Sequence, residues 1–294
     1  MTKERGFEDL SIRSLVCWTI LLCFILGIVF GFTKDILKIN IEENLESAIF
    51  ELAFYGAALL WIITKFKKLN LDLNCMIGKY PSEYKWWYYV VIVITLMFFS
   101  IGAFYIQYYI ISLVNPGYVE GILNEKDILT SRDSSFFVFY NLLNFIITVI
   151  VAPIVEELVF RGVLLHRLAV KWNIRKAILI SSLIFGFLHH DVLGAFTFAV
   201  VMSILYIKWK SIKVCIICHM INNFLAVGTG LIAVFIDNNT SVQTIAQFRS
   251  EVLGGVICFI LTVPFISYYI CVNIYRENLY LPYFYEENRN SIRA

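Results

Sequence analysis

Long apolar runs recur along the whole chain, and they constrain the fold more than any other feature of the sequence. Most of them are long enough to cross the ~30 Å hydrocarbon core of a bilayer as a helix. The 294 residues are 60% hydrophobic and only 16% charged, an apolar share well above that of a soluble domain. The sequence therefore predicts an all-α, polytopic integral membrane protein with about eight transmembrane helices, at Leu15–Phe32, Ala48–Ile63, Trp87–Val114, Phe136–Val155, Ala177–His190, Leu193–Ile207, Val214–Ile236 and Val252–Ile274.

These spans divide the chain into three parts. Residues 1–135 hold the first three helices, residues 136–236 the core helices, and residues 237–294 the last helix and a tail. Only two residues join the fifth span to the sixth, which predicts a helical hairpin there. Gly27 and Gly31 have the small-x-x-x-small spacing that lets another helix approach closely.

The distribution of Lys and Arg predicts the orientation. With eight spans, 19 of the 24 basic residues fall on the side that carries both termini. Because basic residues are enriched in cytoplasmic loops, both termini are predicted to be cytoplasmic. The abundance of residues with AT-rich codons (Ile, Phe, Tyr, Asn and Lys) favours a bacterial cell membrane. The lipid bilayer is the expected surrounding, and no basic run indicates a nucleic-acid partner.

Three ionisable side chains lie close together inside an apolar run at residues 152–162. Charged groups within a membrane are costly and usually functional. On a helix, Glu157 shares a face with Arg161, so these two are expected to form an ion pair. Glu156 points about 100° away and has no obvious local partner, which suits a general base or a metal ligand. The alternative is a structural ion pair near the membrane surface, with Glu156 reaching water.

Further polar side chains lie on two other spans. His189 ends the fifth span, and His219 and Asn223 lie one turn apart on the seventh. Convergence of these residues with Glu156 into one pocket would give each a partner. An imidazole beside a carboxylate can activate water, and an imidazole with an amide can donate to a developing oxyanion. The pattern predicts a peptide hydrolase without a nucleophilic side chain.

The three motifs resemble those of a known family. They are Glu156-Glu157-x-x-x-Arg161, Phe185-x-x-x-His189 and His219-x-x-x-Asn223, in this order on separate spans. They are similar to the motifs of the type II CAAX prenyl endopeptidases, also called the CPBP or abortive-infection family, over about residues 140–235. The resemblance implies an eight-helix intramembrane endopeptidase that cuts a peptide or a membrane-anchored protein near the cytoplasmic face. It also implies that Glu156 and His189 activate water, and that His219 and Asn223 stabilise the oxyanion.

Other interpretations stay open. Glu156, His189 and His219 would make a two-His, one-carboxylate set suitable for zinc. The chain has no His-Glu-x-x-His, the usual signature of helical zinc proteases, so chemistry without a cofactor is the first expectation and zinc the second. A non-catalytic immunity or scaffold protein of the same fold is the alternative function. A small transporter is disfavoured, because no pair of broken helices is visible.

Overall fold

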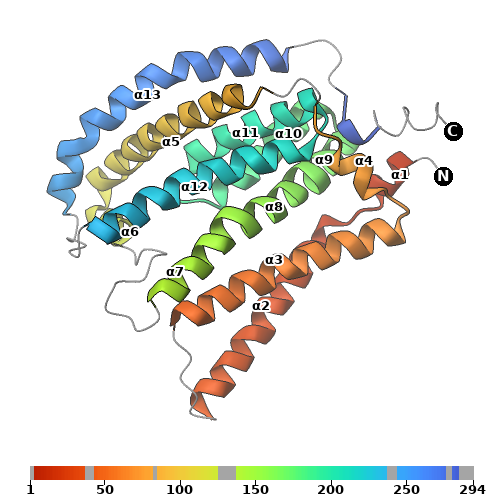
Figure 1. The fold of residues 1–294 in the computed structure, drawn as a ribbon, viewed down its shortest axis with the longest axis horizontal. Coiled ribbons are helices and arrows are strands. Elements are labelled where there is room, and N and C mark those ends of the chain that lie inside the picture. The colour runs from red at the N-terminus through yellow and green to blue at the C-terminus, as the bar shows by residue number, and fades with distance from the viewer. Residues whose placement is uncertain are drawn as a thin grey trace.

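The protein is described by a computed structural model that covers residues 3–36, 43–81, 85–124, 137–236, 244–275 and 280–284. Within these ranges the regular structure is entirely helical (Figure 1). Six helices are long and apolar enough to cross a membrane. They are α2 (Ile12–Asp35), α3 (Glu43–Lys68), α5 (Trp86–Val114), the helix that includes Val138–Lys171, α11 (Val192–Trp209) and α13 (Ile245–Ile274). The predicted all-α membrane protein is confirmed.

One of the eight predicted spans is shorter than expected. It is the fifth, α10 (Ile174–Phe187), whose 14 residues make a helix of ~21 Å, less than the thickness of the hydrocarbon core. The seventh, α12 (Ile212–Ile236), covers the whole predicted range with 25 residues, and Ile212–Gly228 is its apolar described part. By length and composition, six helices qualify as spans in the part of the chain that is described.

The fourth span is longer than predicted and contains two widened turns. It runs through α7 (Phe137–Ile146), the π-helix η1 (Ile147–Val151), α8 (Ala152–Glu157), the π-helix η2 (Leu158–Leu164) and α9 (Leu165–Lys171). Pro153 has no N–H, and its ring would clash with a carbonyl in a regular turn. The i→i+5 turn just before it, closed by Ala152 N–H on the Ile147 carbonyl, accommodates this ring. Because the helix continues past the motif, Arg161 is buried within it and is a basic residue that does not lie in a loop.

The predicted hairpin between the fifth and sixth spans is confirmed. α10 ends at Phe187 and α11 begins at Val192. Gly186 makes the tight approach possible, because a Cβ at this position would lie 2.7 Å from the Val192 carbonyl oxygen. The Asp191 side chain caps α11 by accepting from the Gly194 N–H at 3.0 Å.

α5 and α13 run side by side along one edge of the bundle (Figure 1). They meet at small residues, since a Cβ on Gly102 would lie 2.7 Å from the Gly255 carbonyl oxygen. α13 curves along its course and carries Pro264 within the helix. No described atom lies within 4 Å of a Cβ built at Gly27 or Gly31, so no described helix of this chain approaches closely at these glycines.

Three short helices were not predicted: α1 (Lys3–Glu8), α4 (Leu73–Ile77) and α6 (Pro116–Leu123). α1 and α4 lie together at the end of the bundle where α3 ends (Figure 1). Tyr283 joins them there: its ring lies 5.0 Å from that of Phe7, and its hydroxyl accepts from the Asp72 N–H at 2.9 Å. The first helix and residues 280–284 thus share one end. The membrane side of that end stays a prediction, and the C-terminal Ala294 lies outside the described residues.

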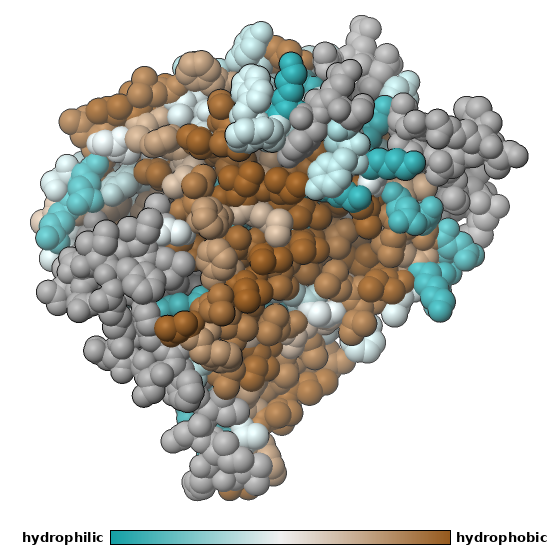
Figure 2. All heavy atoms as spheres, in the orientation of Figure 1, coloured by the Kyte–Doolittle hydropathy of each residue, from teal (hydrophilic) through white to brown (hydrophobic). Residues whose placement is uncertain are grey.

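The outer surface is mostly apolar. A broad hydrophobic area covers the face shown in Figure 2, with hydrophilic residues gathered at its margins. Large exposed apolar side chains occur on helices at both edges of the bundle, including Trp18, Phe24, Leu60, Phe265 and Tyr268. Such a surface is suited to contact with lipid.

Candidate functional site

Glu157, at the end of α8, is the centre of the polar cluster inside the bundle. Its Oε1 atom accepts from Arg161 Nη1 at 3.0 Å and from His219 Nδ1 at 2.9 Å. The side chains of Glu157 and Arg161 are 0% and 1% exposed. The predicted ion pair is confirmed. The contact with His219 was not predicted, because it joins α8 to α12, and helical spacing gives contacts only within one helix.

Arg161 is held by more than its carboxylate partner. Nη2 donates to the Ala199 carbonyl on α11 at 3.3 Å, and the guanidinium carbon lies 5.0 Å from the centre of the Phe185 ring. Cation–π contacts of this kind gain strength away from water. One buried cation therefore ties the Glu helix to α10 and α11.

Glu156 faces a different direction, as the sequence predicted, but it does have partners. Its Oε1 atom accepts from the Tyr55 hydroxyl at 3.2 Å, and its Oε2 atom lies 3.8 Å from His219 Nε2. The Glu156 side chain is 21% exposed. As predicted, Glu156 has no partner within its own helix among the described residues, and Tyr55 comes from α3, far away in the sequence. Tyr55 is the site residue that sequence reasoning missed, and no motif marks it.

His219 lies between the two glutamates. A carboxylate only accepts hydrogen bonds, so the contact with Glu157 places a proton on Nδ1 and fixes the orientation of the ring. Nε2 then faces Glu156 across 3.8 Å, a distance too long for a direct hydrogen bond. The ring also packs edge-on against Phe198 at 5.0 Å. The geometry leaves a carboxylate oxygen and an imidazole nitrogen directed at the same small space.

Asn223 lies one turn after His219 on α12. Its Nδ2 atom donates to the Thr148 carbonyl in η1 at 2.9 Å, and its Oδ1 atom accepts from Asn222 at 3.3 Å. The side chain is half-buried. Asn223 thus links α12 to the widened turn that precedes the glutamates.

His189 is connected to the polar cluster through the ring of Phe185. It lies two residues after the end of α10, and its ring stacks on Phe185 at 4.4 Å, with Nδ1 2.7 Å from the Phe185 carbonyl oxygen. Phe185 in turn lies edge-on to His219 at 6.0 Å. Among the described residues no hydrogen bond joins His189 to Glu156 or to His219. The predicted convergence is direct for Glu156 and His219 and indirect for His189.

The segment that carries His189 is fixed from α5. The Ser100 hydroxyl donates to Asp191, and Gln107 Nε2 and the Tyr108 hydroxyl donate to the His190 carbonyl at 2.9 and 3.2 Å. Burial raises the pKa of the Asp191 carboxyl, and its hydrogen bonds from Ser100 and the Gly194 N–H oppose that change. These contacts set the position of the turn, and through it the position of His189.

A zinc site would need Glu156, His189 and His219 to surround one point. In the described ranges, no group of three or more His, Cys, Asp or Glu side chains is placed to hold a metal ion. Glu156, His189 and His219 are thus not assembled as a ligand set in this structure. Whether activity needs a metal stays a prediction.

Comparison with known proteins points to membrane proteases. Residues 138–225 match the family described as type II CAAX prenyl endopeptidase Rce1-like. The chain is 40% identical over 90 residues to the proposed membrane peptidase YdiL of Bacillus subtilis, covering 28% of this chain and 35% of that protein. It is 35% identical over 108 residues to the membrane-embedded CAAX protease MroQ of Staphylococcus aureus, covering 34% and 41% respectively.

The aligned segments thus span less than half of either relative. No solved structure matches. The matched segment runs from α7 to the middle of α12 and includes both glutamates, Arg161, His189, His219 and Asn223. Residues 138–225 of this integral membrane protein are therefore similar to the Rce1-like type II CAAX prenyl endopeptidases.

Proposed function

We propose that the chain is an intramembrane endopeptidase that hydrolyses a peptide bond close to the cytoplasmic face of a bacterial cell membrane, with water as the nucleophile. The observation that carries this proposal is the pairing of Glu156 and His219. They come from different helices, face each other across 3.8 Å, and are each held by a second partner. Tyr55 holds Glu156, and Glu157 holds His219.

Glu156 is the proposed base. It takes a proton from a water molecule with help from His189, the resulting hydroxide attacks the peptide carbonyl, and the proton passes to the leaving amine. The products are a carboxylic acid and an amine. His219, with a proton on Nε2 as well as on Nδ1, and Asn223 donate to the oxyanion that forms on the carbonyl. Glu157 holds His219 through Nδ1, and Arg161 holds Glu157.

The proposed substrate is a peptide or a membrane-anchored protein, since the site lies inside a membrane helix bundle. The names of the family and of the relatives support a CAAX-protease-like reaction, and the site needs no bound cofactor for the steps above.

The test is cleavage of a peptide library, with and without lipid modification, by the purified protein in detergent. Glu156→Gln should reduce cleavage to background. Glu120→Gln, at an exposed position on α6, is the matched control and should cleave as the wild type does. Equal cleavage by wild type and Glu156→Gln would exclude the proposed base.

A further inference from the structure

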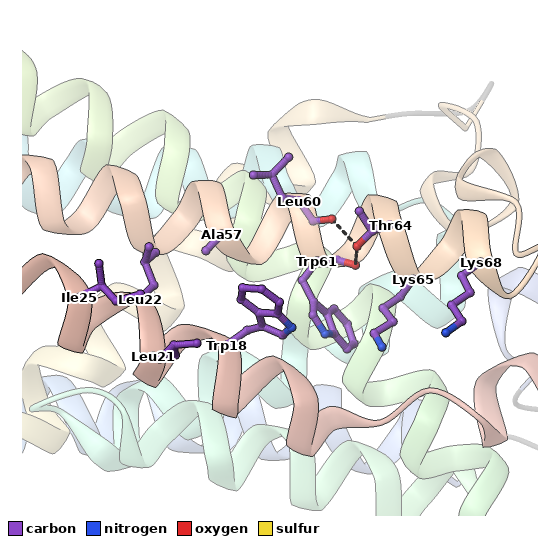
Figure 3. Close-up of a pocket in the computed structure, with 10 residues that line it drawn as sticks. All are labelled: Trp18, Leu21, Leu22, Ile25, Ala57, Leu60, Trp61, Thr64, Lys65 and Lys68. Atoms are coloured by element: carbon purple, nitrogen blue, oxygen red, sulfur yellow. Dashed lines mark hydrogen bonds between the residues drawn. The ribbon is translucent and has the colours of Figure 1, made fainter.

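A groove of about 480 Å³ lies between α2 and α3, away from the polar cluster. Figure 3 shows it as a line of side chains that begins with apolar residues and ends with two lysines. Its lining consists of Trp18, Leu21, Leu22, Ile25, Ala57, Leu60, Trp61, Thr64, Lys65 and Lys68. All of these residues come from the two antiparallel helices, so the groove follows the direction in which α2 and α3 cross the membrane.

The groove, including its charged end, is open and about as long as one leaflet is deep. From Ala57 to Lys68 the helix rises ~16 Å, about half of the ~30 Å hydrocarbon core, and the apolar lining on α2 from Trp18 to Ile25 extends over ~10 Å of this. Trp18 and Leu60 are 59% and 65% exposed. Trp61 is buried, and its Nε1 donates to the Ser14 hydroxyl at 3.0 Å, so it presents only its ring as a wall. Thr64 also lines the groove next to the charged end, and its hydroxyl donates to the carbonyls of Leu60 and Trp61 in its own helix.

The charged end consists of Lys65 and Lys68, in the last turn of α3. Neither ammonium group pairs with a carboxylate among the described residues. Two cations at one end of an apolar groove fit a ligand that has a hydrocarbon chain and a negatively charged head. By the predicted orientation this end faces the cytoplasmic leaflet, where anionic lipids are enriched.

We propose that the groove binds an anionic phospholipid, with one acyl chain along α2 and α3 and its phosphate at Lys65 and Lys68. The two lysines at one end of the groove and the length of the groove match this ligand. The groove also lies on the side of α3 opposite to the proposed catalytic site. Tyr55 contacts Glu156, and Ala57, two residues later and ~200° around the helix, lines the groove. The proposal therefore holds whether or not the chain is a protease.

The test is retention of lipid by the purified full-length protein. The protein is incubated in detergent with equal amounts of phosphatidylglycerol and phosphatidylcholine, and bound lipid is measured by native mass spectrometry. Wild type should retain at least tenfold more phosphatidylglycerol, and high salt should abolish the preference. The double variant Lys65→Gln/Lys68→Gln should lose it. Lys67→Gln/Lys79→Gln removes two charges outside the groove and should keep it.

An uncharged variant tests the apolar wall separately. Ala57→Trp fills the middle of the groove and should lower retention of both lipids. Equal retention of the two lipids by wild type would overturn the proposal without any variant. Equal loss in both lysine pairs would mean a diffuse surface charge and would also overturn it. If a lipid-modified peptide depends on Lys65 and Lys68 and phosphatidylglycerol does not, the groove belongs to the substrate and the proposal is wrong.

Discussion

Removing either member of the Glu157–Arg161 pair should destabilise the protein, whereas removing the neighbouring Glu156 should not. Both members of the pair are almost fully buried, with Nη1 and Oε1 3.0 Å apart. Without Arg161, the buried Glu157 carboxylate keeps only its contact with His219. Breaking a buried pair on one side costs about 3–5 kcal/mol. At about 2 °C per kcal/mol for a long chain, the melting temperature should fall by about 6–10 °C.

The assay compares three variants in one detergent: Glu157→Gln, Arg161→Ala and Glu156→Gln. Glu156→Gln is the matched control, because it makes the same chemical change one residue away. Its amide oxygen can still accept from the Tyr55 hydroxyl, and it no longer places a charge in the bundle. We expect its melting temperature to hold or rise while peptide cleavage falls to background. The other two variants should lose both stability and activity.

A double variant tests whether Glu157 and Arg161 stabilise the protein as a pair or independently. Glu157→Gln/Arg161→Ala leaves no unpaired charge, so its loss of stability should be smaller than the sum of the two single losses. Additive losses would show that the two residues act independently. The reasoning would also be refuted if Glu156→Gln unfolded as readily as Arg161→Ala, or if it cleaved peptide normally.

Three further predictions concern the site and the orientation. Tyr55→Phe should reduce the cleavage rate about tenfold, since hydrogen bonds to charged groups are worth about 1.5–3 kcal/mol. Tyr118→Phe, at an exposed position, is its control, and a Tyr55→Phe rate equal to that of the wild type would remove Tyr55 from the site. Dialysis against strong chelators should leave cleavage intact, and a loss restored by zinc would reverse the preference for metal-free chemistry. Reporter fusions at Ala294 and within residues 115–135 should report opposite sides of the membrane, and the same side for both would contradict the predicted topology.

Much of the fold follows from the sequence because lipid imposes a simple rule on it. Backbone groups in hydrocarbon must be paired within the chain, so long apolar runs become helices, and all eight predicted runs are helical. Hydropathy does not predict how deep in the membrane a residue lies or how many residues a helix has. α10 is as apolar as a span, yet it has only 14 residues. The fourth helix continues to Lys171, because its polar residues are paired inside the bundle and do not end it.

The site was predictable where its contacts lie within one helix. Spacing alone gave Glu157 with Arg161, and it placed Glu156 on another face. Contacts between helices depend on packing, which a single sequence does not encode in any spacing. Tyr55 on α3 and the second contact of Glu157 were missed for this reason. His189 was predicted to meet the other residues directly, and the structure places the Phe185 ring between it and His219.

The two π turns have a consequence for how this helix tolerates changes in length. Each is equivalent to an α turn with one residue inserted, as the bonds from Ala152 N–H to Ile147 O and from Leu165 N–H to Phe160 O indicate. One residue corresponds to ~100° of rotation about the helix. Deleting a residue within 147–151 would convert η1 to a regular turn and rotate α7 by that angle, while the spacing from Glu156 to Arg161 stays unchanged. A one-residue deletion there would therefore change the face that α7 presents and the position of the Thr148 carbonyl that Asn223 binds, without changing the spacing of the glutamates and Arg161.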